Sequence, residues 1–496
     1  MDVLGVAAHA RANPSKTAIV TEDRRIAYAE LDARSNMVAH ALAGRGVGAG
    51  DRVALALRNR PEAFEVLTGA ARLGAEIVPV SWRCAPEEFE YYVADSGARV
   101  LLAEDEHRAA TAGLPAIHLS DYEAWLAGSP ATPPPDTPDP APTLLRYYTS
   151  GTTGRPKAVE RPPRRADEYL DSVVASCHRL AVGGPDQVHL MVGPAYHSGP
   201  LSYGVYSLLL GQTLVLPARS DPAQVLDLIE RERVTWSFMV PIHFIRLLAL
   251  PDEQRARDLS SVRRILHAGA PCPPEVKRAA LALFPPGTIW EFYGSTEGRG
   301  TLISPEEWLR KPGSVGRPIE GIRIAILDEM GRELPPGEVG LIYMSPVGAE
   351  RFVYAGAPDK TDAAWRGDLF TVGDMGYLDE DGYLFLTDRQ IDMIITGGAN
   401  VYPAEVEATL HRHPAVADVA VVGVPDEEFG ESVLAIVELG SPADAGDLIA
   451  FCREHLAHYK CPRSVQIVEQ LPRDPNGKVR KRDLRAPWWK GRARAI

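Results

Sequence analysis

Several features that would place this chain outside the ordinary globular enzymes are scarce or missing. Cysteine is rare, and the five residues stand singly, which suits a reducing compartment. No stretch approaches the roughly 18 apolar residues that a membrane-spanning helix needs, and residues 1–16 lack the basic start and apolar run of a signal peptide. Basic residues are outnumbered by acidic ones, 53 to 66, which argues against nucleic acid or an anionic membrane as a partner. We therefore expect a cytoplasmic protein without a membrane span.

Four potential zinc ligands follow one another at spacings of three residues: Cys452, His455, His458 and Cys461. On a helix, steps of three residues drift by about 60° each, so these side chains fan over half of the circumference. A tetrahedral zinc site needs its ligands to converge on one point. The spacing therefore favours structural and surface roles for these residues.

The 496 residues are too many for one ordinary core, and 45% apolar with 24% charged residues is typical of a soluble globular enzyme. After a short lead-in, strands alternate with helices, which predicts a mainly parallel α/β sheet. A connector rich in Pro and Asp (residues 130–142) separates this region from a second α/β region. The expected strands are Asp51–Leu57, Ala75–Val80, Arg99–Ala103, Val234–Val240 and Val262–His267, and the expected helices are Pro61–Leu73, Pro86–Ser96, Pro222–Arg233 and Pro274–Phe284.

The chain changes character twice more. Short strands with Gly and Pro turns from Gly313 to Tyr383 indicate a small β-rich subdomain, and the order helix, strand, strand, helix after Ala404 indicates a compact α+β unit. We predict an α/β protein whose large N-terminal domain has two α/β subdomains plus the β-rich subdomain, followed by a small mobile α+β C-terminal domain. The predicted boundaries are 1–388 for the N-terminal domain, 389–392 for a hinge and 393–496 for the C-terminal domain.

Residues 147–157 (YYTSGTTGRPK) concentrate glycine, hydroxyl and lysine side chains in one loop. Glycines let backbone N–H groups approach a polyphosphate, hydroxyls donate further hydrogen bonds, and Lys157 supplies a positive charge. A Walker loop would run from its lysine straight into a helix, whereas here Pro156 precedes the lysine and strand-like residues follow it. The pattern therefore predicts a phosphate cradle of another kind.

Further motifs follow in order along the chain. They are AYHSG (195–199), HAGAP (267–271), WEFYGSTEG (290–298), TVGDMGY (371–377), TDRQIDMIITGGANVYPAE (387–405) and PRDPNGKVRK (472–481). Taken singly, most of them would be turns or core segments, although the small residues of HAGAP suit a flat purine. Together with the loop, the ordered set resembles the signature motifs of the adenylate-forming superfamily, which comprises acyl-CoA synthetases, aryl-CoA ligases, luciferases and adenylation domains. The resemblance covers essentially the whole chain.

The resemblance implies a role for each motif residue. Tyr293 packs on adenine, Asp374 accepts both ribose hydroxyls, and Glu297 holds Mg²⁺, a cation that prefers oxygen ligands. The residues implied to be catalytic are Lys478, Thr296, Glu297 and His197, of which His197 borders the acyl pocket and the thiol tunnel. The residues implied to bind nucleotide or CoA are Thr149, Ser150, Gly151, Thr152, Thr153, Gly154, Lys157, Gly269, Ala270, Pro271, Tyr293, Gly294, Asp374, Arg389, Gly397 and Gly398. The implied metal ligands are Glu297 and Thr152.

Three positions of the C-terminal part receive specific roles by the same resemblance. Lys478, on the tight turn at Asn476-Gly477, is the adenylation lysine that bridges the carboxylate and the α-phosphate. Gly397-Gly398 leaves room for a pantetheine arm. Ile391 departs from the family pattern, because many relatives carry Asp or Lys there, so domain rotation could differ in rate.

We expect an ATP-dependent acyl-CoA ligase that forms acyl-AMP and pyrophosphate and then transfers the acyl group to CoA. Its cofactors would be ATP, Mg²⁺ and coenzyme A, its partner a small-molecule carboxylic acid, and a homodimer is one candidate assembly. An adenylating enzyme that serves a carrier protein or another nucleophile, a relative specialised for one half-reaction, and a non-catalytic nucleotide-binding regulator are the alternatives. The intact Glu297, Asp374 and Lys478 argue against the regulator.

The acid substrate is expected to be bulky and apolar. The small glycines beside Glu297 suggest a roomy pocket, so a fatty, terpenoid, steroid-like or aryl acid would fit. The residues expected to line the pocket are Trp236, Phe238, Val240, His197, Gly298, Arg299 and Gly300.

Overall fold

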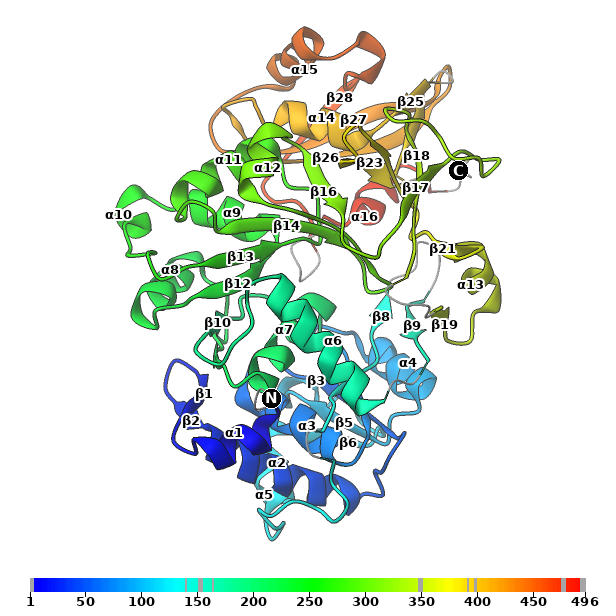
Figure 1. Ribbon diagram of the computed structural model, residues 1–496. Helices are drawn as coiled ribbons and strands as arrows, with labels where there is room; N and C mark the ends of the chain where they lie inside the picture. Colours follow the sequence, from blue (N-terminus) through cyan, green and yellow to red (C-terminus); the bar gives the residue numbers. More distant parts are fainter. Residues whose placement is uncertain are drawn as a thin grey trace. The chain divides into compact units, whose positions relative to one another are not determined.

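The structure is a computed structural model that describes residues 4–138, 141–149, 155–162, 165–346, 351–389, 392–396, 399–473 and 479–490. By their contacts, the residues form two compact units. The first unit contains Met1–Met239, Leu250–Leu266 and Phe352–Pro358, and the second contains Val240–Ala249, His267–Arg351 and Asp359–Ile496. The predicted α/β class, with a large N-terminal and a small C-terminal domain, is confirmed (Figure 1). In the part of the chain that is described, no helix has the length and apolar character needed to cross a bilayer.

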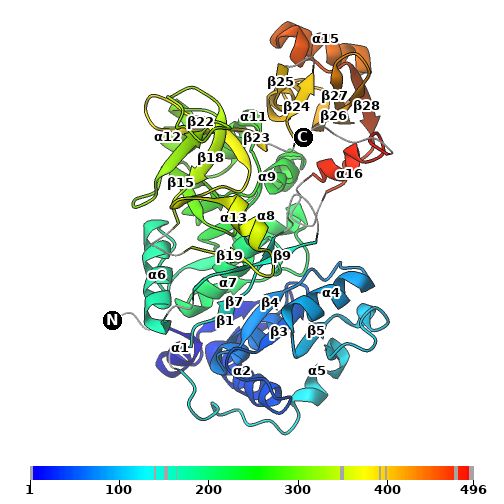
Figure 2. The same ribbon diagram turned by 90° about the vertical axis from the view of Figure 1, so that its right-hand side faces the viewer.

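A five-stranded parallel sheet of order β6-β5-β3-β4-β7 forms one core of the first unit. Its side chains alternate between two faces: Val53 and Leu55 join the core that α2 and α3 cover, whereas Ala54 and Ala56 face α4. Figure 2 shows α2 and α4 on opposite sides of these strands. The bounds are β3 Arg52–Ala56, β4 Glu76–Pro79, β5 Val100–Ala103, β6 Ala116–His118, β7 Leu144–Leu145, α3 Pro61–Arg72, α4 Pro86–Ser96 and α5 Leu119–Leu126.

The first fifty residues are not the short lead-in that the sequence suggested. They contain α1 (Val6–Ala12), two strands and the long helix α2 (Tyr28–Ala43). The start of α2 was missed because Ala27, at its N-cap, has no side-chain oxygen to mark a helix start. Helix α2 packs closely on α3 at Gly69, where a Cβ atom would lie 2.7 Å from Val38 Cγ1.

A second sheet of the first unit has the order β2-β1-β11-β10-β12-β13, and its pairs β1-β11, β11-β10 and β10-β12 are parallel. Only its edge pair, β1 with β2, is antiparallel among the pairs whose register is described. A small third sheet has the order β19-β9-β8. The bounds are β1 Thr17–Val20, β2 Arg25–Ala27, β8 Tyr148–Thr149, β9 Lys157–Glu160, β10 Val188–Leu190, β11 Thr213–Val215, β12 Trp236–Met239, β13 Arg264–His267, β19 Val353–Tyr354, α6 Ala166–Arg179, α7 Ser198–Leu209, α8 Pro222–Arg231 and α10 Asp252–Arg255.

The second unit contains a set of antiparallel strands in the order β14-β15-β16-β23-β22-β18-β21-β20, with β17 beside β18. Gly316 of β16 has a φ of 101°, and a Cβ there would lie 2.2 Å from Leu302 O, so this bend requires glycine. The bounds are β14 Ile289–Gly294, β15 Arg299–Ile303, β16 Ser314–Pro318, β17 Ile324–Leu327, β18 Gly340–Met344, β20 Trp365–Arg366, β21 Leu369–Phe370, β22 Asp374–Leu378, β23 Leu384–Arg389, α9 Pro241–Leu248, α11 Pro274–Leu283, α12 Pro305–Arg310 and α13 Pro358–Ala364.

The C-terminal part has its own sheet, of order β25-β24-β27-β26 with β28 beside β27. Alternate residues of β26 and β27 enter two apolar cores, one on each face. Cys452 and Cys461 are buried in one of these cores, which is the structural role that we predicted. The bounds are β24 Ile394–Thr396, β25 Ala399–Val401, β26 Val416–Asp426, β27 Gly430–Leu439, β28 Ser464–Val468, α14 Pro403–Leu410, α15 Ala445–His455 and α16 Lys481–Arg485.

Candidate active site

The strands β8 and β9 flank the predicted phosphate loop, and they pair so that Thr149 lies opposite Lys157. Because β9 begins at Lys157 itself, the lysine does not lead into a helix, and the exclusion of a Walker loop is confirmed. Thr149 Oγ1 is buried and has no hydrogen-bond partner among the residues that the structure describes, which fits a group that awaits a ligand oxygen. The predicted loop residues Ser150, Gly151, Thr152, Thr153 and Gly154 lie outside the described residues.

Helix α4 holds the end of this loop through two residues that no motif marked. Asp95 Oδ1 lies 3.3 Å from Lys157 Nζ, and Asp95 Oδ2 accepts a hydrogen bond from the Tyr148 hydroxyl at 2.8 Å. Burial by itself would lower the pKa of Lys157, but the hydrogen bond and charge of Asp95 outweigh it and raise that pKa. The Tyr91 hydroxyl donates to the carbonyl of Pro156 at 2.5 Å. Lys157 is therefore a positioned cation.

The segment before His197 is fixed by the side chain of Asn59. Its Nδ2 donates to the carbonyl of Gly193 at 2.9 Å, and its Oδ1 accepts from the N–H of Ala195 at 2.8 Å. His197 then stands at the N-cap of α7, with its ring centroid 4.3 Å from that of Tyr196. Burial lowers the pKa of His197 to about 3, so its imidazole is neutral at pH 7.

Two residues of β12 that were expected to line the acyl pocket have different environments. Trp236 is 1% exposed, stacks on His189 at 3.7 Å between ring centroids and donates its Nε1–H to Gln212. The structure therefore places Trp236 in the core of the first unit, which corrects that expectation. Phe238, further along β12, packs against α7, where a Cβ at Gly199 would lie 2.8 Å from Phe238 Cε1.

In the second unit, two motif residues from different strands are joined directly. The hydroxyl of Tyr293, on β14, donates to Asp374 Oδ2 at 2.8 Å. Asp374 begins β22 and pairs with Arg389 of β23, whose side chain lies outside the described residues. The residues predicted to contact adenine and ribose are therefore positioned by one hydrogen bond and one strand pair.

The turn between β14 and β15 carries Thr296, which is half-buried, and Glu297, which is buried. The N–H of Ser295 donates to the carbonyl of Gly298 at 2.7 Å, and the N–H of Glu297 donates to Ser295 Oγ at 3.2 Å. These bonds close the turn and fix the backbone beneath the predicted metal ligand. A Cβ at Gly294 would lie 2.9 Å from Gly298 O, so the turn also needs glycine at that position.

The glycines beside Glu297 pack against neighbouring side chains. A Cβ at Gly298 would lie 2.6 Å from Phe370 Cζ, and one at Gly300 would lie 3.0 Å from Met344 Sδ. Close packing therefore explains why these positions are small. This finding removes the glycines as a sign of a roomy acid pocket, which is what the sequence had suggested.

A buried ion pair lies next to the HAGAP segment (267–271), which is predicted to contact adenine. Lys277 of α11 is 0% exposed, and its Nζ is paired with the carboxylate of Glu291 on β14. His267, the last residue of β13, lies 3.5 Å from the same carboxylate, and burial followed by the charge of Lys277 keeps its pKa far below the usual range. The pair ties β14 to the helix that follows HAGAP. Beyond His267, Gly269 and Pro271 are exposed and Ala270 is half-buried, so this segment is accessible to a base.

The C-terminal motif residues Gly397, Gly398 and Lys478, together with Ile391 of the predicted hinge, lie outside the described residues. Their flanks are described. Thr396 pairs with Ala399 across β24 and β25, and Arg473 pairs with Val479 on either side of the Lys478 segment.

Comparisons with known proteins agree with these motifs. The chain matches the AMP-binding enzyme family over residues 6–349 and the AMP-binding enzyme C-terminal domain over residues 405–478. It is 36% identical to a feruloyl-CoA synthase of an Amycolatopsis species, with 96% of each chain covered. It is 34% identical to the fatty acid–[acyl-carrier-protein] ligase ScoC of Streptomyces coeruleorubidus, with 98% of this chain and 96% of the relative covered.

Solved structures show the same likeness over nearly the whole chain. ATP-bound MatB from Rhodopseudomonas palustris matches with a TM-score of 0.84 at 29% identity, covering 98% of this chain and 99% of that one. The o-succinylbenzoate CoA synthetase MenE from Bacillus subtilis, in complex with the acyl-adenylate intermediate OSB-AMP, matches with a TM-score of 0.82 at 30% identity, covering 97% of both. The chain belongs to the AMP-binding enzyme family of adenylate-forming ligases.

Proposed function

We propose that the protein activates an apolar, aryl carboxylic acid with ATP and transfers the acyl group to coenzyme A. Its family makes it an AMP-forming acid–thiol ligase that uses ATP, Mg²⁺ and CoA. Among the acids suggested by the sequence, fatty, terpenoid, steroid-like and aryl, we favour an aryl acid. Relatives named feruloyl-CoA synthase and indoleacetate–CoA ligase (the latter from Aromatoleum aromaticum, 35% identical, with 96% of each chain covered) support this choice, as do the neutral His197 and the apolar Phe238.

The hydrogen bond between Tyr293 and Asp374 is the observation on which the nucleotide assignment rests. It fixes the carboxylate that would accept the ribose hydroxyls, while Tyr293 offers its ring to adenine. Glu297 and Thr152 would hold Mg²⁺, which neutralises phosphate charge when bound, and a carboxylate with a hydroxyl is an oxygen donor set of the kind it prefers. The orphaned Thr149 Oγ1 fits a phosphate oxygen.

The first reaction step requires electrostatic positioning, because a carboxylate and a triphosphate repel each other. The substrate carboxylate attacks the α-phosphorus, the bond to the pyrophosphate breaks, and acyl-AMP forms. We propose that Lys478 donates to the carboxylate and the α-phosphate during this step and that Lys157, held by Asp95, binds the departing phosphates. In the second step the CoA thiolate attacks the acyl carbon and AMP leaves.

We propose that the C-terminal domain (393–496) turns about residues 389–392 between these steps, relative to the N-terminal domain (1–388). Lys478 would serve acyl-AMP formation in one position, and Gly397-Gly398 would admit the pantetheine arm in the other. Shielding acyl-AMP from water gives such a motion its chemical purpose.

Two variants separate the steps. Lys478→Ala is expected to slow acyl-AMP formation by roughly 10²–10³, the usual cost of one preorganised donor, while still converting supplied acyl-AMP to acyl-CoA. Gly398→Leu is expected to do the reverse and to keep pyrophosphate exchange. Lys490→Ala, at an exposed lysine of the same domain, is the matched control and should change neither step. Equal losses of both steps in Lys478→Ala would contradict the two-position mechanism.

The substrate is tested separately with a panel of aryl, fatty and terpenoid acids, Mg-ATP and CoA, with products read by mass spectrometry. Acyl-CoA from an aryl acid supports the proposal, whereas acyl-AMP that CoA does not consume would shift it to a carrier protein as acceptor. The relative ScoC, named as a ligase for an acyl-carrier protein, makes that second acceptor a specific candidate. We also propose that the protein is cytoplasmic and that it forms a homodimer. Light scattering can test the dimer.

A further inference from the structure

The side chain that positions Lys157 is itself an anion, and it lies in the last turn of helix α4, beside strands β8 and β9 (Figure 1). Asp95 Oδ1 is 3.3 Å from Lys157 Nζ, and Asp95 Oδ2 accepts a hydrogen bond from the Tyr148 hydroxyl at 2.8 Å. The helix dipole disfavours a carboxylate in the last turn, and residues 93–96 supply no basic side chain to offset it. Lys157 and Tyr148, on the strands that flank the phosphate loop, supply that compensation.

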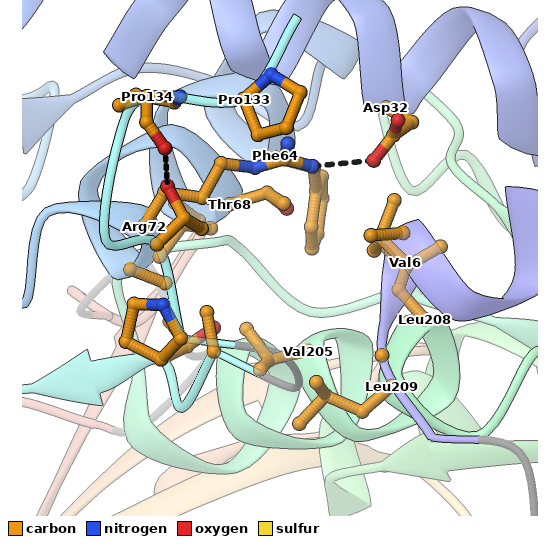
Figure 3. A pocket seen from close by; sticks show the side chains of 18 of the residues that line it. Val6, Asp32, Phe64, Thr68, Arg72, Pro133, Pro134, Val205, Leu208 and Leu209 are labelled. Carbon is orange, nitrogen blue, oxygen red and sulfur yellow. Dashed lines mark hydrogen bonds and ion pairs between the residues drawn. The ribbon is translucent and has the colours of Figure 1, made fainter.

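The pair between Lys157 and Asp95 differs from a structural ion pair of the same unit. Arg72 and Asp32, which line a cavity of about 490 Å³, are 2.6 Å apart, and the Arg72 side chain is only 3% exposed (Figure 3). The side chains of Lys157 and Asp95 remain 27% and 20% exposed, and their contact is longer. Ion pairs as open as this one contribute little stability. A phosphate that arrives from solvent can therefore bind the lysine at the expense of the carboxylate.

The backbone around Lys157 is fixed by contacts that do not involve Asp95. The Tyr91 hydroxyl donates to the carbonyl of Pro156 at 2.5 Å, and the pairing of β8 with β9 places Lys157 opposite Thr149. The guanidinium of Arg155 also lies over the Tyr91 ring, 5.1 Å from its centroid. Removing the carboxylate at position 95 would therefore remove a charge and leave the backbone of the lysine in place.

The carboxylate of Asp95 also acts on any phosphate that Lys157 binds. Two anions that contact the same ammonium group lie within about 6 Å of each other, because each oxygen is about 3 Å from the nitrogen. At that separation, the repulsion between two unit charges lowers an affinity about threefold even in the dielectric of bulk water. Asp95 thus holds Lys157 while the site is empty and opposes its binding to phosphate once a nucleotide is present.

We propose that Asp95 is a positioning residue that limits how tightly Lys157 binds the β- and γ-phosphates, so that pyrophosphate can leave after acyl-AMP has formed. The inference rests on the phosphate role proposed above for Lys157. With nucleotide bound, Asp95 competes with the phosphates for the ammonium group, and as pyrophosphate departs the carboxylate pairs with the lysine again. Asp95 therefore sets the affinity for one product and takes no part in the chemical steps.

The test uses α,β-methylene-ATP with Mg²⁺, a nucleotide that carries the β- and γ-phosphates but is not cleaved between the α- and β-phosphorus. Calorimetry with the full-length protein compares its affinity with that of AMP, which lacks both phosphates. Asp95→Asn keeps the size of the side chain and removes its charge. We expect this variant to bind α,β-methylene-ATP about two- to fivefold more tightly and AMP as before. Asp95→Ser, which is uncharged and smaller, should show the same gain. Glu90→Gln, at an exposed glutamate of the same helix, makes the same change in net charge and should alter neither affinity.

Lys157→Met separates this inference from the proposed function. The variant should weaken α,β-methylene-ATP relative to AMP, and the gain from Asp95→Asn should shrink when both changes are combined. If Lys157→Met leaves the ratio of the two affinities unchanged, the phosphate role of Lys157 is wrong and the inference falls with it. If Lys157→Met lowers the ratio but both changes at Asp95 lower it too or have no effect, the competition alone is overturned. Damage to the fold weakens binding, so it does not produce the expected gain.

A second measurement tests the contact in the nucleotide-free protein. Burial lowers the pKa of Lys157, but the hydrogen bond and charge of Asp95 raise it above its usual value. Acetic anhydride reacts with the unprotonated amine, so Lys157 should be acetylated at least twofold faster at pH 9 in Asp95→Asn, as mass spectrometry of its peptide measures. Glu90→Gln should react like the unchanged protein. An unchanged rate in Asp95→Asn would show that the carboxylate does not hold the lysine and would overturn the proposal.

Discussion

Replacing Tyr293 with phenylalanine tests whether the bond to Asp374 prepares the nucleotide site. The change removes one hydroxyl and keeps the ring that is expected to contact adenine. A hydrogen bond to a charged group contributes about 1.5–3 kcal/mol. Tyr293 is 7% exposed but Asp374 is only half-buried, so we take a value at or below the low end, about 1–1.5 kcal/mol. Tyr293→Phe should therefore weaken AMP binding roughly five- to tenfold.

Calorimetric titration with AMP measures this effect in a double-mutant cycle with Asp374→Asn. If Tyr293 acts by orienting the carboxylate, its removal should cost little once the carboxylate is gone, and the two changes should be non-additive by about 1 kcal/mol. The matched control is Tyr383→Phe, because the Tyr383 hydroxyl also donates to a carboxylate, Glu307 Oε1 at 3.1 Å, among residues that no motif marks. Strict additivity, or an equal loss in Tyr383→Phe, would refute the reasoning.

Three further outcomes follow from buried or strained groups. Lys277→Met leaves the Glu291 carboxylate buried without its cation and should lower the free energy of unfolding in urea by about 3–5 kcal/mol. The double change Lys277→Met with Glu291→Leu should recover part of this lost stability. No loss in the single variant would contradict the ion pair. Burial lowers the pKa of His189 to about 3, so as the pH falls below about 6.5 this histidine is protonated in the unfolded chain before it is protonated in the folded one. Between pH 6 and 4, His189 therefore removes about 1.4 kcal/mol of stability per pH unit. His189→Phe should flatten the dependence of the urea midpoint on pH by that amount, and an unchanged slope would disprove the prediction. Gly316→Ala should cost about 1–3 kcal/mol in thermal unfolding, because its φ is 101° and its Cβ would meet Leu302 O. Gly337→Ala, at a φ of 88° but with open space around its Cβ, should lose less.

Much of the fold could be predicted because the chain marks it locally. Helices such as α3, α4, α8 and α11 begin with proline at their first turn, and the buried strands between them are short apolar runs with clear ends. The motif order likewise predicts which residues bind the nucleotide. These signals lie in consecutive residues, so they can be recognised from the sequence alone.

The contacts that position the site could not be predicted in the same way. Asp95 and Tyr91 stand on an ordinary helix, and nothing near them in the sequence shows that they hold the loop more than sixty residues later. Lys277 lies on an amphipathic helix, where a lysine normally faces solvent, yet it pairs with Glu291 across the core. The small size of Gly298 and Gly300 has two explanations in sequence, open space or close packing, and only the positions of Phe370 and Met344 decide between them.

Phe238 is predicted to line the acid pocket, so its contact with Gly199 has a consequence for how substrate preference can change. The first methyl group added at position 199 would meet the Phe238 ring at 2.8 Å, so the two positions are not independent in mutational terms. A smaller residue at 238 would permit alanine or serine at 199, whereas the reverse order passes through a clash. Laboratory selection for new acids should therefore accept changes at 238 first, and libraries that randomise the two codons together should reach combinations that single-site scanning misses.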